Sequence, residues 1–142
     1  MLLSATNAVK AKLINLWVVF DTIRMNGGIS RSGIADETGL SKQASSDLVD
    51  ELIAMQFVQE TKPSGRRVGK PPVPLRLNPD GAFSLGFHVD VGQMSAIAVN
   101  LAGDVLHRED HALNDLEPQH AVVQLDLATK RLLASARIPD DR

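Results

Sequence analysis

The sequence predicts an α+β protein made of two units, and three observations lead to this prediction. Apolar side chains recur at helical spacing in three stretches between residues 9 and 55. Short segments that alternate apolar and other side chains follow from residue 57 onward, which is typical of strands. Charge and proline content change at Asn78-Pro79-Asp80-Gly81, a strong turn signal. We therefore expect one unit over residues 1–80 and another over residues 81–142.

Composition excludes several classes of protein. The chain has 142 residues, of which 44% are hydrophobic and 23% charged, so it is not a wholly disordered chain. It has no cysteine, which excludes disulfides, thiolate zinc sites, iron–sulfur clusters and cysteine nucleophiles. The apolar run over residues 13–20 is shorter than the roughly 20 residues that span a bilayer. We expect a cytoplasmic protein with no membrane partner.

The first unit is expected to begin with a helix that ends at Gly27-Gly28. Its apolar face has spacings of four, three, four and three residues, through Val9, Leu13, Leu16, Phe20 and Ile23.

Two shorter helices should follow. Ser30 begins the first of them, Ile34 and Ala35 point inward, and Gly39 closes it. Ser41 is placed to cap the next helix, because its hydroxyl can accept from unpaired backbone N–H groups. The apolar positions of that helix are Ala44, Leu48, Leu52 and Met55, flanked by Val49 and Ile53.

A basic, proline-rich hairpin is expected next. Phe57-Val58 starts its first strand and residues 73–77 form the return strand. Residues 61–79 contain five basic side chains, no acidic one and five of the seven prolines. Three helices followed by a two-stranded wing is the pattern of a winged helix-turn-helix, whose third helix enters the DNA major groove.

The start of the third predicted helix has the polar side chains that base recognition needs. Gln43 can pair with adenine, Lys42 can contact phosphate or guanine, and serine hydroxyls can reach base edges or phosphates. The basic wing tip suits phosphate contact. The predicted contacts with double-stranded DNA are Ser30, Arg31, Ser41, Lys42, Gln43, Ser45, Ser46, Arg66, Arg67 and Lys70.

The second unit is expected to contain three short strands over residues 82–106 and an amphipathic helix over residues 118–135. The helix face would contain Val122, Leu125, Ala128 and Leu132. The four histidines lie in this unit, but they lack the convergent spacing of a zinc site, so we expect neither a metal nor a cofactor.

Several motifs resemble the amino-terminal part of repressors of the ROK family (repressor, open reading frame, kinase). They are Gly28-Ile29-Ser30-Arg31, the stretch from Thr38-Gly39-Leu40-Ser41-Lys42-Gln43 to Leu48-Val49-Asp50-Glu51-Leu52, Gly65-Arg66-Arg67, Gly69-Lys70-Pro71-Pro72, Leu75-Arg76-Leu77-Asn78-Pro79, and residues 83–92. The resemblance implies a DNA-binding repressor of sugar-metabolism genes. It also implies that residues 81–142 are the truncated start of an actin-like, sugar-kinase-like α/β domain.

The sequence departs from the family pattern at four places. Gly33 removes a capping-box carboxylate, Gln56 replaces a common turn glycine, and Asp47 stands where the family often has arginine. The family's phosphate loop, Asp-x-Gly-Gly-Thr, is degenerate here: Asp90 and Gly92 remain, but Gln and Met follow. We therefore expect no catalytic residues and no ATP binding.

Two alternatives stay open at this stage. One is a relative of the ATP-dependent sugar kinases or its inactive fragment, and the other is a fragment that aggregates through apolar strand faces. As a regulator, the chain is expected to bind DNA weakly on its own and to lack a sugar effector. A tight complex would mean that the helix face over residues 9–23, or the helix over residues 118–135, builds a homodimer.

Overall fold

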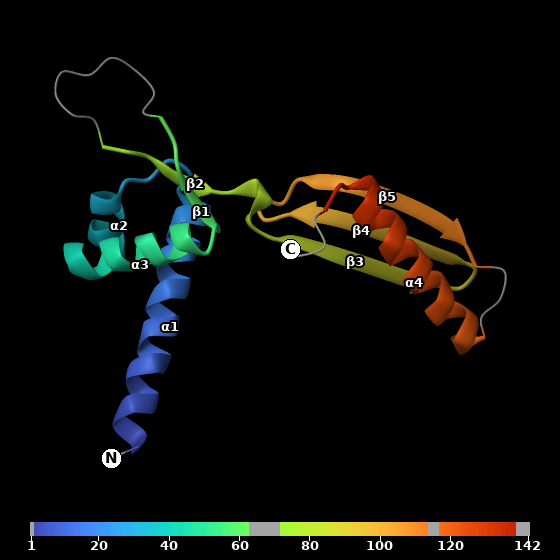
Figure 1. Cartoon of the computed structure of the whole chain (residues 1–142), viewed down its shortest axis with the longest axis horizontal. Helices are drawn as coiled ribbons and strands as arrows, with labels where there is room; N and C mark the ends of the chain where they lie inside the picture. The colour runs from blue at the N-terminus through green and yellow to red at the C-terminus, as the bar shows by residue number, and fades with distance from the viewer. Residues whose placement is uncertain (1, 63–71, 114–116, 139–142) are drawn as a thin grey trace. The chain divides into compact units, whose positions relative to one another are not determined.

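The computed structural model describes residues 2–62, 72–113 and 117–138 (Figure 1). The chain divides into two compact units, Met1–Asn78 and Pro79–Arg142. The α+β class predicted from the sequence is confirmed, because the described residues form helices and two small antiparallel sheets. Among these residues, no helix is both long enough and apolar enough to cross a membrane.

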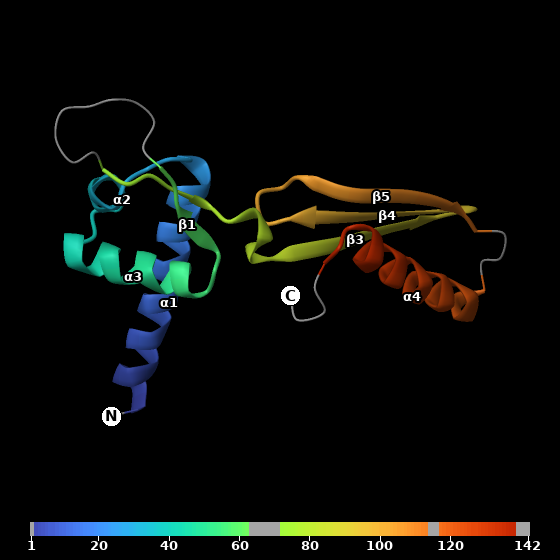
Figure 2. The ribbon, with the colours of Figure 1, turned by 45° about the horizontal axis from the view of Figure 1, so that its top comes forward.

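The first unit contains three helices and a two-stranded sheet. In chain order these are α1 (Leu2–Met25), α2 (Arg31–Thr38), α3 (Lys42–Ala54), β1 (Val58–Glu60) and β2 (Leu75–Leu77). The strands pair antiparallel, with Val58 opposite Leu77. Figures 1 and 2 show α2 and α3 beside the carboxyl-terminal half of α1, whereas its amino-terminal half extends past them.

The predicted helix caps are confirmed. The Ser30 hydroxyl accepts from the backbone N–H of Gly33 at 3.2 Å, and the Ser41 hydroxyl accepts from that of Ala44 at 3.2 Å. Each bond pairs a backbone donor that the helix itself leaves unpaired. Gly39 ends α2 with φ of 71°, a left-handed conformation that glycine adopts without a Cβ clash.

A single apolar core joins all five elements of the first unit. Its buried members are Val19, Ile23, Ile34, Leu48, Val49, Leu52, Val58 and Leu75. The apolar face expected for the first helix is only partly correct, because Val9 is 61% and Leu13 60% exposed. Met55 is also exposed, and Val49 takes the buried position instead.

The turn from α3 into β1 contains a strained residue. Gln56 has φ of 63°, in the left-handed region where a side chain costs on the order of 1 kcal/mol. The Asn78 side-chain amide donates to the Gln56 carbonyl at 2.8 Å and so ties this turn to the end of the unit. The glycine that the family often has here would relieve the strain.

The second unit is a three-stranded meander with one helix. Its elements are a 3-10 turn (Pro79–Gly81), β3 (Phe83–Asp90), β4 (Gln93–Asn100), β5 (Val105–Ala112) and α4 (Pro118–Ser135). The strand order is β3-β4-β5, and α4 lies against one face of the sheet (Figures 1 and 2). The buried residues between them are Met94, Ala96, Ala98, Leu113, Ala128, Leu132 and Ile138.

The bounds of α4 match the prediction, but two details of this unit were wrong. The third strand runs to Ala112 and does not end near residue 106, so His107 and His111 lie within a strand. Val122 is 65% exposed and does not share the buried face of Ala128 and Leu132.

Candidate nucleic-acid interface

The first turn of α3 presents polar side chains to solvent. Ser41, Lys42 and Gln43 are all exposed, and α3 is held from behind by the core residues Leu48 and Leu52. The start of a helix is where a helix-turn-helix protein contacts base edges. All three residues are therefore accessible to solvent, but the Ser41 hydroxyl already accepts the capping hydrogen bond.

Gln43 has a neighbour within its own helix. Its amide Nε2 donates to Asp47 Oδ1 at 2.7 Å, one turn further along α3. Both side chains are exposed. The carboxylate therefore engages one of the two N–H donors with which Gln43 would contact the N7 acceptor of adenine.

Ser45 has to be removed from the predicted DNA contacts. It is 0% exposed and faces the inside of the unit, because it lies on the same side of α3 as Leu48, Val49 and Leu52. Its hydroxyl has no hydrogen-bond partner among the described residues. A buried side chain on the inner face of the helix cannot reach DNA.

Arg31 also has a different environment from the predicted one. Its guanidinium lies 2.7 Å from Asp50 Oδ1 and 3.1 Å from Glu60 Oε1. It donates to the Ser46 carbonyl at 3.2 Å and to the Ser46 hydroxyl at 2.9 Å. The hydrogen bond that Arg31 donates to Asp50 is the largest influence on the pKa of Arg31 and raises it above its ordinary value, against the opposing effect of burial.

These contacts join the start of α2 to α3 and β1. A phosphate contact by Arg31, or a base contact by the Ser46 hydroxyl, would have to replace them. Ser30 is similarly occupied as the cap of α2. The sequence predicts Ser30, Arg31 and Ser46 as DNA contacts. It does not predict the ion pairs of Arg31, because Asp50 and Glu60 are distant from it in sequence.

The predicted wing residues Arg66, Arg67 and Lys70 lie outside the described residues. On the described part of the hairpin, Lys62 follows β1 and Arg76 lies in β2, and both are exposed. A Cβ added at Gly28 would lie 3.6 Å from the Arg76 guanidinium, so this arginine lies over the turn after α1. Arg76 is thus an exposed cation that was not among the predicted DNA contacts.

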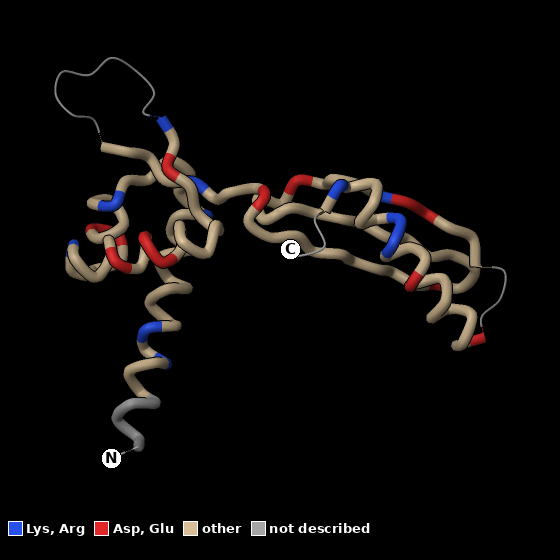
Figure 3. Tube along the Cα trace, viewed as in Figure 1, with Lys and Arg blue, Asp and Glu red and all other residues tan. Residues whose placement is uncertain are grey.

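Acidic residues follow the exposed start of α3 along the helix (Figure 3). Asp47, Asp50 and Glu51 lie further along the helix, and Lys42 is its single cation. Glu51 pairs with Lys12 of α1 at 2.8 Å. The described part of the first unit therefore offers DNA phosphates little net positive charge.

In the second unit, the stretch that resembles a degenerate phosphate loop lies at the turn between β3 and β4. Asp90 and Gly92 are exposed, and Asp90 Oδ1 accepts from the backbone N–H of Val91 at 2.7 Å. Met94, which replaces the family's threonine, is 1% exposed and belongs to the core under α4. Its side chain is therefore a packing residue and does not face a ligand at the turn.

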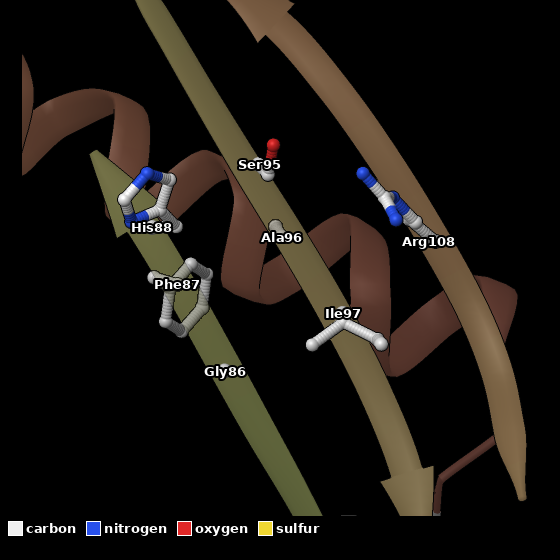
Figure 4. Close-up of a pocket in the computed structure, with 7 residues that line it drawn as sticks. All are labelled: Gly86, Phe87, His88, Ser95, Ala96, Ile97 and Arg108. Carbon is white, nitrogen blue, oxygen red and sulfur yellow. The ribbon is translucent and has the colours of Figure 1, made fainter. Parts of the chain in front are cut away.

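A shallow hollow of about 370 Å³ lies on the sheet of this unit (Figure 4). His88, Ser95, Ile97 and Arg108 are among its lining residues. No sequence motif pointed to it. Within the described ranges, no cluster of three or more His, Asp or Glu side chains is placed to hold a metal ion.

No family model matches the chain. It is 30% identical to a xylose repressor of Bacillus spizizenii over 108 residues, which are 76% of this chain and 28% of that protein. It is 30% identical to a xylose repressor of Caldicellulosiruptor bescii over 135 residues, 94% of this chain and 34% of that one.

A similar fold occurs in a solved structure described as a ROK family transcriptional regulator, a homologue of the E. coli MLC protein. The TM-score is 0.69 with 23% sequence identity, over 88% of this chain and 32% of that chain. The present chain thus spans about a third of the length of the relatives it matches.

Proposed function

We propose that this chain is a member of the ROK family and a DNA-binding transcriptional regulator, a repressor of sugar-metabolism genes. Residues 1–80 form the winged helix-turn-helix domain that binds a double-stranded operator, and residues 81–142 form the first part of a sugar-kinase-like domain. The observation that carries the proposal is the exposed polar turn at the start of α3, fixed by the Ser41 cap.

In this proposal, α3 enters the major groove with its first turn foremost. Gln43 reads a base edge, Lys42 contacts phosphate, and the wing residues Arg66, Arg67 and Lys70 add contacts that do not depend on sequence. Arg31 and Ser46 hold α2, α3 and β1 together and do not touch the bases.

The repressors to which the chain is similar favour this function over that of a sugar kinase. The environment of Met94 supports the same choice, because a buried thioether cannot donate a hydrogen bond to a phosphate. A sugar effector is proposed only for the whole protein and is not assigned to the described residues. The proposed location is the cytoplasm, where the operator DNA of a bacterial regulator lies.

The proposal is tested at low salt, where weak binding is strengthened, by selecting the preferred duplexes for the full chain from a pool of random DNA. We expect one enriched motif and a specific complex. The Gln43→Ala variant should lose discrimination at one base pair by about 1–3 kcal/mol. Gln93→Ala, an exposed glutamine in the second unit, is the matched control and should leave the preference unchanged.

Two results would contradict this proposal. Failure to enrich any sequence would argue against a sequence-specific regulator. An equal loss of affinity for all duplexes in Gln43→Ala would make Gln43 a backbone contact and would remove its proposed role in reading bases.

A further inference from the structure

Four side chains of α1 form a stripe with a positive charge at one end and a negative charge at the other. Lys10, Ile14, Trp17 and Asp21 follow at spacings of four, three and four residues, which places them along one face of the helix. Ile14 is 54% and Trp17 64% exposed. The stripe therefore starts with a cation, has two uncovered apolar side chains at its centre and ends with an anion.

Further apolar side chains widen the centre of this stripe. Leu13 on one side and Val18 on the other are 60% and 40% exposed. Trp17 stacks on Phe20 with ring centroids 5.6 Å apart, and Phe20 meets Phe57 edge to face at 6.4 Å. The uncovered surface is thus continuous with the core of the first unit, and a contiguous exposed apolar patch of this kind is typical of an interaction site.

We propose that the Lys10–Asp21 stripe is an interface between two copies of this chain, in which the two α1 helices pack antiparallel. The two-fold axis passes between residues 15 and 16. In this register, Ile14 of each copy lies against Trp17 of the other, and Lys10 of each copy lies opposite Asp21 of the other. A two-fold interface repeats every contact, so each pair occurs twice.

The charge order selects a second copy in this orientation. A parallel pairing would place like charges opposite each other, whereas the antiparallel pairing matches each cation with an anion. Asp21 already pairs with Arg24 of its own helix at 2.7 Å, so in the dimer its carboxylate would be shared between Arg24 and the second Lys10. This inference concerns association of the chain and does not depend on its binding DNA.

The test uses the full chain in the absence of DNA. Sedimentation equilibrium over a range of concentrations should show a reversible dimer. The emission of Trp17, the single tryptophan of the chain, should shift to shorter wavelength as the dimer forms. Trp17→Lys should weaken dimerisation by more than about 30-fold, as expected for a central tryptophan at an interface. The matched control is Val91→Lys, at a position that is 82% exposed on the β3–β4 turn, and it should dimerise normally.

Charge exchange tests the orientation separately. Lys10→Asp and Asp21→Lys should each weaken the dimer by about 2- to 30-fold, and the double variant should recover most of that loss. Circular dichroism of every variant checks that the helices remain folded. A wild-type chain that stays monomeric, or a dimer that Trp17→Lys leaves intact, would overturn the interface. A double variant that shows no recovery would overturn the antiparallel register.

Discussion

Replacing Arg31 by methionine distinguishes a bracing role from the phosphate contact that the sequence predicts. Methionine keeps most of the apolar stem and removes the guanidinium. If the contacts with Asp50, Glu60 and Ser46 describe the role of this residue, the variant should lose stability. Its affinity for DNA should keep the same dependence on salt.

The magnitude follows from the contacts. The two ion pairs are partly exposed, with the Arg31 side chain 32% accessible, so each contributes about 0.2–1 kcal/mol. The hydrogen bonds to Ser46 add about 0.5–1.5 kcal/mol. Because one guanidinium makes all of these contacts, their energies are not additive, and we expect a total loss of about 1–2 kcal/mol.

Urea unfolding at one low protein concentration, followed by the fluorescence of Trp17, measures this loss in the first unit. Arg24→Met is the matched control, because Arg24 is exposed and pairs only within its own helix in the described structure, so its loss should stay below about 0.5 kcal/mol. The reasoning is refuted if Arg31→Met keeps its stability and the salt slope of DNA binding falls by about 0.9, the value for one phosphate contact.

Three further predictions concern single features. Ser45→Ala removes a buried hydroxyl without a partner among the described residues, so the free energy of unfolding should stay level or rise by up to about 1 kcal/mol in urea titrations, and a clear loss would contradict this. Replacing Arg66 and Arg67 by alanine should reduce the salt slope by about 2 in DNA titrations, and an unchanged slope would show that they do not contact phosphates. For Glu109, burial raises the pKa, but hydrogen bonds from His111 and Arg131 outweigh it, so the net pKa lies below the ordinary 4.5. The stabilisation of the folded state by this carboxylate is therefore present above pH 4.5 and is lost as the pH falls through the lower pKa of the folded state. Glu109→Gln should flatten the acid unfolding curve followed by circular dichroism.

The sequence predicts those parts of the fold that depend on local chemistry. Ser30, Gly39 and Ser41 cap or end helices because a hydroxyl or a missing Cβ acts within one turn of its own position. The partners of Arg31 were not predictable in the same way, since Asp50 and Glu60 reach it only after the chain has folded back. The second half of β5 was not predicted either, because its charged side chains at alternate exposed positions do not give the apolar alternation typical of a strand.

Helical periodicity gives the faces of a helix but not what covers them. The pattern that contains Val9 and Leu13 continues into Phe20 and Ile23, yet only the second half lies against the unit's own core. On α3, the same periodicity places Ser45 on the buried face with Leu48 and Leu52, so the predicted DNA contact at Ser45 is wrong. In both helices, tertiary packing decides which positions of a face are covered.

In the proposed DNA complex, the contact between Gln43 and Asp47 makes base recognition an exchange of hydrogen bonds. One of the two N–H donors of the Gln43 amide is bonded to this carboxylate at 2.7 Å, and DNA binding brings the carboxylate toward a negatively charged duplex. Only a base that offers both an acceptor and a donor returns more hydrogen bonds than the amide gives up. In the proposed complex, the internal acceptor lowers the affinity for every sequence, and the loss is largest for duplexes that offer Gln43 a single hydrogen bond.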